Sequence, residues 1–371
     1  MESRFLNTRR QFVSGVAALG GTLGFAQHAL AQDATPSSSG EWTEPDWSSD
    51  PLPFKVVERT DTTVTVETEL DGTLELPADA GRIVCMYGGE DRFIALGLGD
   101  RVVSVVSFDG ENPTFTSDAD FNRYLTNPDM YIAPNNGQPD MEELIELAPD
   151  LIVGPTALIT DEYYATLSAI APTIRATYNP LRGSLTAWGD YFGLQDLAAA
   201  QIANLDDYAT RARAEVQPVI GDQKTAVVFY MQPDVLYAIL AWDSNPAIGT
   251  YVSNAYGAPF YRELGLRPTD FVENIADETG RENMQYGGLL TLSSEQMGKL
   301  DADFLFMVVA SEGSRAEVTE VLQSDPVYHA IPAVENNQAY VITTEEFSGG
   351  YLATYRAIQL AVATITHRPL I

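Results

Sequence analysis

The sequence predicts an α/β protein in which two lobes, each built around a largely parallel sheet, are joined by one long helix. Three observations support this fold class. Short apolar runs alternate with helical patterns in both halves of the chain, as expected for βα units. Residues 194–216, between the halves, contain neither glycine nor proline. A short pattern of acidic and leucine residues occurs once in each half, and the length of 371 residues fits about two domains.

Residues 1–31 are predicted to be an export signal and not part of the fold. Arg9 and Arg10 precede one variable residue and then apolar residues, an arrangement that resembles the twin-arginine export motif. The Gly/Ala-rich stretch over 13–26 follows, and it is too short and too weakly hydrophobic for a membrane anchor. The alternative is a chance basic start before a disordered leader.

The end of this segment has the small-x-small pattern that signal peptidase cleaves. The pattern is Ala29-Leu30-Ala31, so we expect cleavage between Ala31 and Gln32. No cysteine follows directly after the apolar stretch, where a lipid would be attached. We therefore expect a soluble periplasmic protein that carries no lipid. Residues 32–54, rich in Ser, Pro, Asp and Thr, are predicted to be a flexible leader.

The N-terminal lobe is predicted over residues 55–193. It begins with a hairpin, because an alternating pattern over 64–68 is followed by the turn dipeptide Asp71-Gly72 and a return strand over 73–76. Apolar runs and helical patterns then alternate along the chain. The expected strands are 83–86, 102–106, 151–153 and 173–176, and the expected helices are 91–98, 141–148 and 162–171.

The linking helix is predicted over residues 194–217, which are dense in Ala, Leu, Gln and Arg. About 22 helical residues at 1.5 Å per residue give a length of roughly 33 Å, which is enough to bridge two domains. The C-terminal lobe, predicted over 218–371, repeats the alternation. Its expected strands are 225–231, 235–240, 304–309 and 339–342, and its expected helices are 251–264, 294–300, 315–322 and 352–365.

The two halves share a short internal repeat. Glu142 precedes Asp150 by eight residues in the first half, and Glu295 precedes Asp303 by the same spacing in the second. Each copy has an acidic helix start, an apolar helix face, and then an aspartate and a strand. Two copies do not make a solenoid, so they indicate two similarly built lobes.

Both copies of the repeat have a helix-capping pattern. Asp140 and Ser293 are predicted N-caps, and Glu143 and Gln296 follow three residues later, which is the spacing of a capping box. This pattern places the repeated glutamate of each copy at the second position of its helix.

The composition argues against two classes of partner. Acidic residues outnumber basic ones by 52 to 21, which gives a formal net charge of −31. Nucleic acids and anionic lipids both attract basic surface, so neither is expected to bind. The only lysines are Lys55, Lys224 and Lys299. An acidic, lysine-poor surface is typical of a salty medium, in which counterions screen self-repulsion. The alternative explanation for the use of arginine in place of lysine is a GC-rich genome.

Residues suited to catalysis or to bare-metal binding are scarce. Cys85 is the only cysteine, which excludes an internal disulfide and a Cys-rich zinc site, and its apolar neighbours predict a buried residue. Without the leader, His329 and His367 are the only histidines, and both are predicted to lie on the surface. No nucleophile elbow, zinc-protease motif, P-loop or dinucleotide fingerprint occurs, so we expect no catalytic residue, no cofactor and no direct metal ligand. Two carboxylate pairs could bind a cation, Asp301 with Asp303 and Asp118 with Asp120. In so acidic a chain we interpret them as solvated surface.

A set of aromatic residues with one arginine is predicted to contact the ligand. They fall in segments placed after strands, and loops at the carboxyl ends of parallel strands are where α/β folds bind ligands. Aromatic surface with an occasional arginine suits a flat, anionic organic ligand. For each residue taken alone, a structural role is the alternative. The candidates are Tyr87, Phe108, Tyr178, Trp188, Tyr230, Trp242, Arg281, Tyr286, Phe347 and Tyr351.

Residues 139–153 resemble a known family. Their sequence, PDMEELIELAPDLIV, follows the Pro-x-x-Glu, helix, Pro-Asp-Leu-Ile pattern of periplasmic substrate-binding proteins of the iron-siderophore and cobalamin class. The likeness spans nearly all of residues 55–366 in a consistent order. Further similar segments are 82–84, 96–100, 167–173, 292–296 and 326–342.

The resemblance implies a fold, a ligand and a partner. The fold is that of the helical-backbone, class III proteins, with two Rossmann-like lobes, one interdomain helix and a ligand cleft between the lobes. The ligand is a ferric siderophore or a related chelate, bound by a monomer. The loaded protein docks on a permease dimer with ATPase subunits, and Glu142 and Glu295 face an arginine of each permease subunit. The alternative role for these glutamates is to stabilise helix starts by about 0.3–1 kcal/mol each.

Other functions stay open at the level of the sequence. The alternative ligand for the same scaffold is heme or cobalamin. The sequence also departs from the family pattern at Phe347, which stands where many relatives have a tryptophan. An exported α/β enzyme is the alternative of a different class, although it would need a nucleophile–base pair or a metal site. The sequence names neither the siderophore nor the permease.

Overall fold

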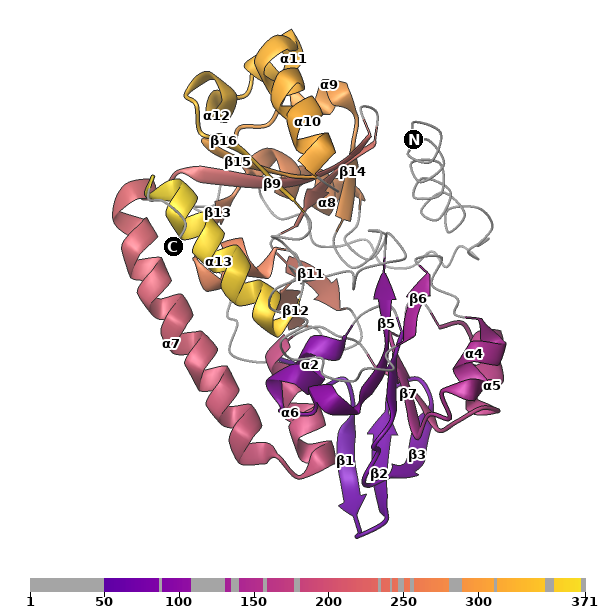
Figure 1. The fold of residues 1–371 in the computed structure, drawn as a ribbon. Helices are drawn as coiled ribbons and strands as arrows, with labels where there is room; N and C mark the ends of the chain where they lie inside the picture. The colour runs from indigo at the N-terminus through magenta and orange to yellow at the C-terminus, as the bar shows by residue number, and fades with distance from the viewer. Residues whose placement is uncertain are drawn as a thin grey trace.

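A computed structural model describes most of the chain beyond the predicted leader (Figure 1). The export signal and the leader as far as residue 49 lie outside the described residues. None of the helices described is long and apolar enough to cross a membrane. The described ranges are 50–86, 89–107, 131–134, 140–155, 159–176, 181–232, 235–240, 242–245, 250–253, 257–279, 289–309, 312–343 and 350–367.

A three-stranded antiparallel sheet opens the fold, and it contains the predicted hairpin. Val64 and Val66 are buried at alternate positions of the central strand, whereas the first strand is largely exposed. Gly72 follows the turn with a φ of 68°, a left-handed conformation that favours glycine. The strands are β1 (Lys55–Arg59), β2 (Thr63–Thr68) and β3 (Gly72–Pro77), in the order β1-β2-β3.

The N-terminal parallel sheet has five strands, and four of them were predicted. All of its neighbouring pairs are parallel. The fifth strand, at one edge, is a short Tyr-Ile-Ala-Pro segment that shows no alternation long enough to predict. The strands are β4 (Ile83–Cys85), β5 (Val102–Ser107), β6 (Tyr131–Pro134), β7 (Leu151–Gly154) and β8 (Thr173–Arg175), in the order β6-β5-β4-β7-β8.

Helices cover both faces of this sheet. On one face Val84 and Ile152 pack with Leu144 and Leu167 of two short helices. On the other face Cys85, which is buried as predicted, packs in the same cluster as the remaining helices. These elements are α2 (Glu90–Ala95), α4 (Met141–Glu146), α5 (Asp161–Ser168), α6 (Leu181–Phe192) and the 3-10 turn η1 (Gly99–Arg101).

Helix α6 was not predicted, because two glycines interrupt its helical pattern. Both glycines have a packing reason. A Cβ atom at Gly183 would lie 2.2 Å from the Pro51 carbonyl oxygen, and one at Gly189 would lie 2.6 Å from the Ala198 Cβ. The glycines therefore allow the chain before β1, and the helix that follows, to approach α6 closely.

The predicted long helix is present as α7 (Gln195–Ile220) and runs along one side of the molecule in Figure 1. It continues past the predicted end and includes Pro218 in its last turn. Its buried residues, which include Leu205, Ala209 and Val216, follow one helical face. That face packs against α6 and the C-terminal half of the chain.

The C-terminal sheet is mixed and not purely parallel. Its strands β9, β15 and β16 are parallel, with β16 at one edge, but β10 runs antiparallel to both β9 and β14. The strands are β14 (Leu289–Leu292), β10 (Val235–Ile239), β9 (Lys224–Gln232), β15 (Phe304–Val309) and β16 (Ala339–Thr343) in that order, with β13 (Arg267–Pro268) beside β9.

The helix predicted over 251–264 is wrong. Its first residues belong to β12 (Thr250–Ser253), which pairs with β11 (Trp242–Asn245). Its end is a five-residue π-helix that contains Pro259. A Cβ atom at Gly257 would lie 2.5 Å from the Leu240 carbonyl oxygen, so tertiary packing fixes this turn. The remaining elements are β11 (Trp242–Asn245), β12 (Thr250–Ser253), η2 (Pro259–Glu263), α8 (Asp270–Thr279), α9 (Ser294–Met297), α10 (Glu312–Ser324), α11 (Pro326–His329), α12 (Pro332–Glu335) and α13 (Tyr351–Ile365).

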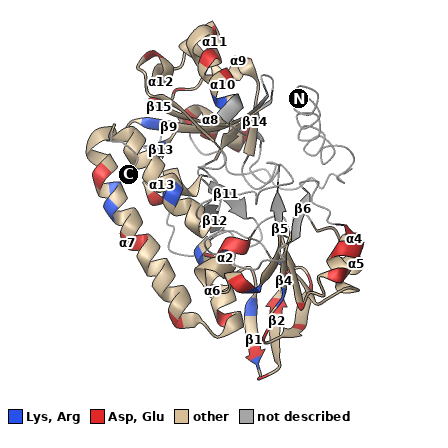
Figure 2. Ribbon diagram, viewed as in Figure 1, with Lys and Arg blue, Asp and Glu red and all other residues tan. Residues whose placement is uncertain are grey.

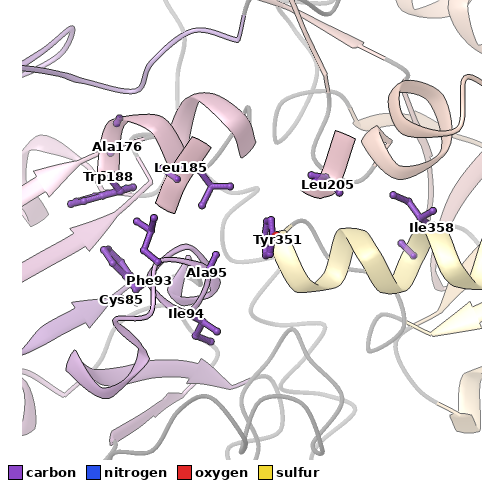
Figure 3. Packing of buried hydrophobic residues seen from close by; sticks show 14 of the residues in the cluster. Cys85, Phe93, Ile94, Ala95, Ala176, Leu185, Trp188, Leu205, Tyr351 and Ile358 are labelled. Carbon is purple, nitrogen blue, oxygen red and sulfur yellow. The ribbon is translucent and has the colours of Figure 1, made fainter. Parts of the chain in front are cut away.

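One hydrophobic cluster joins the two sheets (Figure 3). It extends from Cys85 and Trp188, past Leu205 of α7 and Ile358 of α13, to Phe306 on the inner face of the C-terminal sheet. A separate cluster fills the opposite face of that sheet under α8 to α12. The two halves therefore share one continuous core, and α7 and α13 both belong to it.

Candidate functional site

The candidate site lies where the strands of the N-terminal sheet end. All five strands are parallel, so their carboxyl ends share one edge, and Figure 1 shows β5 and β6 pointing toward the C-terminal sheet. Most predicted ligand contacts follow these or the matching C-terminal strands. Tyr87, Phe108, Tyr178, Arg281, Tyr286 and Phe347 lie outside the described residues, and Trp242 is described only as the first residue of β11.

Trp188 and Tyr230 do not lie in loops, and their predicted placement is wrong. Trp188 is a fully buried residue of α6, and its ring centroid lies 4.8 Å from that of Phe54 and 5.0 Å from that of Phe93. Tyr230 is a buried residue of β9, within the cluster under α8 to α12. Trp188 was misplaced because α6 was not recognised after β8.

Tyr351 also lies in a helix, but at a junction between elements. It is the first residue of α13 and is 5% exposed. Its hydroxyl donates to the Gln201 side-chain oxygen of α7 at 2.7 Å and lies 3.3 Å from the Tyr355 hydroxyl. Burial raises the pKa of Tyr351, so the hydroxyl stays protonated and links α13 to α7.

Two buried acids at the start of α2 were missed by the sequence prediction. Glu90 is 2% exposed, and burial raises its pKa to about 7. Among the residues described, its Oε2 atom has no hydrogen-bond partner. Asp91 is 8% exposed, and burial raises its pKa as well. The available signal was three consecutive charges, Glu90 to Arg92, directly after an apolar strand and two glycines.

Asp91 caps the N-terminus of α13 from the other half of the chain. The backbone N–H groups of Tyr351 and Leu352 donate to its carboxylate. Gly350 is the N-cap residue of α13 and has no side chain to cap the helix itself. A Cβ atom at Gly350 would lie 1.8 Å from Asp91 Oδ2, so only glycine allows this approach. A carboxylate at a helix N-terminus is favourable for the orphan N–H groups and for the helix dipole.

A buried ion-pair network joins the halves at a second place. Arg182 of α6 donates to both carboxylate oxygens of Glu263 in η2, at 2.7 and 2.9 Å, and to Asp206 of α7 at 2.8 Å. The neighbouring Arg262 pairs with Asp50 at 2.6 Å. Because a buried ion pair needs both partners, this network fixes α6 and α7 against η2.

The end of the predicted flexible leader is part of this junction. Asp50 is half-buried and pairs with Arg262, and Phe54 is 2% exposed within the aromatic cluster around Trp188. Residues 50–54 therefore differ from the prediction, because their partners lie far along the chain and leave no local signal.

The repeated glutamates are exposed at the second position of their helices, as predicted. Glu142 is exposed on α4, and Glu295 of α9 has a side chain that is 88% exposed, 3.5 Å from Lys299. Ser293 and Gln296 form the full predicted capping box. In α4, the Asp140 carboxylate accepts a hydrogen bond from the Glu142 N–H at 2.8 Å. The second bond of the predicted capping box, from the Asp140 N–H to the Glu143 side chain, is not formed.

The repeated aspartates have the same role in both copies. Asp150 accepts hydrogen bonds from the backbone N–H groups of Gly81 and Arg82, each at 2.9 Å. Asp303 accepts one from the N–H of Lys224 at 2.8 Å. Each aspartate thus fixes the start of the neighbouring central strand, β4 or β9. The repeat found in the sequence is therefore also a repeat of structure.

The described residues contain no group of three or more His, Cys, Asp or Glu side chains arranged to hold a metal. His329 and His367 are exposed, and His329 Nε2 lies 2.7 Å from the Gln323 carbonyl oxygen. Asp301 pairs with Lys224 and accepts a bond from the Phe271 N–H. Asp118 and Asp120 lie outside the described residues.

A family model described as periplasmic binding protein matches residues 83–346, which is more than two thirds of the chain. The chain belongs to the periplasmic binding protein family. The family resemblance predicted from the sequence is confirmed, and this family consists of extracytoplasmic binding proteins, not enzymes.

Known members of this family resemble the chain along much of its length. The chain is 25% identical over 236 residues to the ferric enterobactin-binding periplasmic protein FepB of Escherichia coli O6:H1, covering 60% of this chain and 65% of FepB. It is 27% identical over 251 residues to the probable siderophore-binding lipoprotein YfiY of Bacillus subtilis, covering 66% and 68%. The chain thus spans just under two thirds of the length of FepB.

A solved structure confirms the coarser part of the predicted fold class. The triscatecholate siderophore-binding protein FeuA of Bacillus subtilis, in complex with ferri-bacillibactin, superposes with a TM-score of 0.62. The alignment covers 81% of this chain and 98% of FeuA, at 16% sequence identity. At this identity the likeness concerns the fold alone, an α/β architecture with parallel sheets and a long helix.

Proposed function

We propose that this periplasmic binding protein captures a ferric siderophore between its two lobes and delivers it to an ATP-driven permease. The observation that carries the proposal is that both relatives, from two different bacteria, are named for siderophore binding. The fold supports it, because the carboxyl ends of the N-terminal strands point toward the C-terminal sheet.

The proposed ligand contacts are those predicted from the sequence that the structure does not place in a core. A ferric siderophore is a large chelate with conjugated groups and oxygen-rich edges, which aromatic rings and arginine match. Trp242, Arg281 and Tyr286 are the proposed contacts in the second lobe, with Tyr87 and Phe108 in the first. Phe347 and Tyr178 remain further candidates, whereas Tyr351 belongs to the hydrophobic core.

A fluorescence screen tests the proposed ligand. The purified protein is titrated with ferric enterobactin, ferri-bacillibactin, heme and cobalamin, and its intrinsic fluorescence is followed. We expect saturable quenching with at least one ferric siderophore and none with heme or cobalamin. Saturable binding of heme or cobalamin alone would assign the scaffold to that ligand and contradict the proposal.

We further propose that Glu142 and Glu295 dock on the permease. Both are exposed at equivalent positions of the internal repeat, and a two-fold permease offers two equivalent cationic sites. The double variant Glu142→Arg, Glu295→Arg should retain chelate affinity and lose uptake. Normal uptake with slightly lower thermal stability would instead assign the glutamates to helix capping.

The proposed location is the periplasm, after export by the twin-arginine route and cleavage after Ala31. Mass spectrometry of the mature protein should find Gln32 at the N-terminus, without a lipid. YfiY is a lipoprotein, but the single cysteine of this chain is buried in β4. Replacing Arg9 and Arg10 with lysine should block export, and continued export would contradict the twin-arginine route.

A further inference from the structure

The two copies of the internal repeat can be compared position by position. The spacing that relates Glu142 to Glu295 also relates Leu144 to Met297, and both of these side chains are fully buried. The same spacing relates Ile145 to Gly298. The caps and strand-fixing aspartates described above also correspond, so this comparison rests on structure and not on sequence spacing alone.

In the first copy, an aliphatic side chain is exposed one helical turn after the glutamate. Ile145 is 58% exposed, although it is a large apolar residue on a short helix. Residues three apart in a helix are neighbours on its surface, so Ile145 lies beside the carboxylate of Glu142. Figure 2 shows that the rest of α4 is rich in acidic residues.

In the second copy, glycine occupies the corresponding position, but a valine from another helix fills the place. A Cβ atom at Gly298 would lie 3.0 Å from the Val327 Cγ1 atom. Val327 belongs to α11 and is itself 38% exposed. Its backbone N–H donates to Asp325 at 2.8 Å, which holds it at the start of α11. Both copies therefore present one aliphatic group next to one exposed carboxylate.

We propose that Ile145 and Val327 are a matched pair of apolar anchors, one in each lobe, for docking on the permease. Each anchor and its neighbouring glutamate would bind a permease loop that carries a cationic side chain beside an apolar one. A two-fold symmetric permease has two copies of such a loop, one for each anchor. The inference rests on the proposed docking of Glu142 and Glu295 and adds the groups that supply binding energy. Apolar groups at the centre of an interface contribute through burial, whereas exposed charges mainly set orientation.

The charge of the chain favours a cationic partner over the other possible occupants. The formal net charge is −31, and both anchors adjoin exposed acidic residues. A second copy of this chain would bring like charges together, and anionic lipid would be repelled. Arginine or lysine next to an apolar residue is the complementary surface.

The test compares two double variants of the full chain. Ile145→Ser with Val327→Ser removes the anchors. The control, Val57→Ser with Leu70→Ser, removes two apolar side chains that are 56% and 54% exposed, one in β1 and one in the turn between β2 and β3. Membrane vesicles from the source cells, right side out, are titrated with each protein after it has been loaded with the ferric siderophore that binds in the fluorescence screen. We expect the anchor variant to bind the vesicles about 10- to 30-fold more weakly, and the control variant to bind as the unchanged protein does.

The outcomes separate this inference from the proposed function. Equal vesicle affinity of the anchor variant and the unchanged protein would overturn the inference, even if the Glu142→Arg, Glu295→Arg variant has lost binding. Dimerisation of the unchanged protein that is lost in the anchor variant would also overturn it, in favour of a second copy. Failure of the unchanged protein to bind any ferric siderophore would instead contradict the proposed function. Since both anchors are exposed, circular dichroism should show the same melting temperature for all variants.

Discussion

At the scale of single residues, the buried Glu90 gives the protein a defined pH dependence. Burial raises its pKa from an ordinary 4.5 to about 7, so between these pH values the folded state holds a proton that the unfolded state has lost. Its contribution to stability is complete below pH 4.5 and is lost as the pH rises through 7. At about 1.4 kcal/mol per pKa unit, the loss amounts to about 3 kcal/mol.

The variant Glu90→Gln should remove this dependence. A neutral amide is indifferent to pH, so the variant should gain stability relative to the unchanged protein at pH 8 and little at pH 4.5. Urea unfolding at several pH values measures the difference. Glu143→Gln, on the exposed face of α4, is the control and should leave the pH profile unchanged. Parallel profiles for Glu90→Gln and the unchanged protein would contradict the raised pKa.

Gly350 should tolerate no larger residue, because Asp91 occupies the space where a Cβ atom would stand. Gly350→Ala should displace the carboxylate from the N-terminus of α13 and destabilise the protein by about 1–2 kcal/mol, the typical value of a lost cap. The control is Gly81→Ala, whose new Cβ would lie 3.6 Å from Asp150 Oδ2, an ordinary contact. Chemical denaturation measures both, and equal stability of the two variants would show that Asp91 is not a cap.

The ligand contacts predicted from the sequence can be tested by single substitutions. Trp242→Ala or Arg281→Ala should weaken siderophore binding about 5- to 150-fold if the residue is a contact. His329→Ala should not change the affinity, because this residue is exposed on α11. Fluorescence titration measures all three, and a loss of affinity in the histidine variant would shift weight to heme or metal ligation.

At the scale of elements, the helices and strands that depend on local sequence were predicted correctly. The strand Phe304–Val309 and the long helix α7 follow from apolar runs and from the absence of breakers. Helix α6 was not predicted, because Gly183 and Gly189 interrupt its helical pattern. These glycines are explained only by close contacts with Pro51, which is distant in the chain, and with Ala198 of the next helix. The helix predicted over 251–264 failed for the same reason, since Gly257 is fixed by packing on Leu240.

The ion pair between α6 and η2 should be costly to break on one side only. Arg182→Ala would leave Glu263, whose side chain is 4% exposed, without its bidentate partner. Removing one member of a buried pair typically costs about 3–5 kcal/mol. Arg211→Ala removes an exposed pair with Asp207 and should cost less than about 1 kcal/mol. Urea unfolding measures both, and similar values would show that the network is not effectively buried.

At the scale of the whole molecule, the two halves of the chain are connected more firmly than the sequence indicated. The long helix was predicted, but the Asp91 cap, the Arg182–Glu263 pair and the packing of residues 50–54 all depend on contacts between distant segments. No local pattern encodes such contacts. These contacts connect the two halves in addition to α7, because they join the N-terminal half to α13 and η2.

Ligand binding should therefore change the overall shape only slightly. One continuous helix resists bending, and the shared core continues from one sheet to the other. Small-angle X-ray scattering with and without a bound ferric siderophore measures the change. We expect nearly equal radii of gyration, and a large decrease on loading would show that the lobes close by a wide hinge movement.

The most direct test of the central claim is uptake of radioactive iron by cells of the source organism that lack this chain. Iron is supplied as the ferric siderophore that binds the purified protein, and the same cells are complemented with the unchanged gene. We predict that deletion abolishes uptake from this chelate and that complementation restores it, while uptake of an unrelated nutrient is unaffected. Normal uptake of the chelated iron in the deletion strain would contradict the function proposed for this protein.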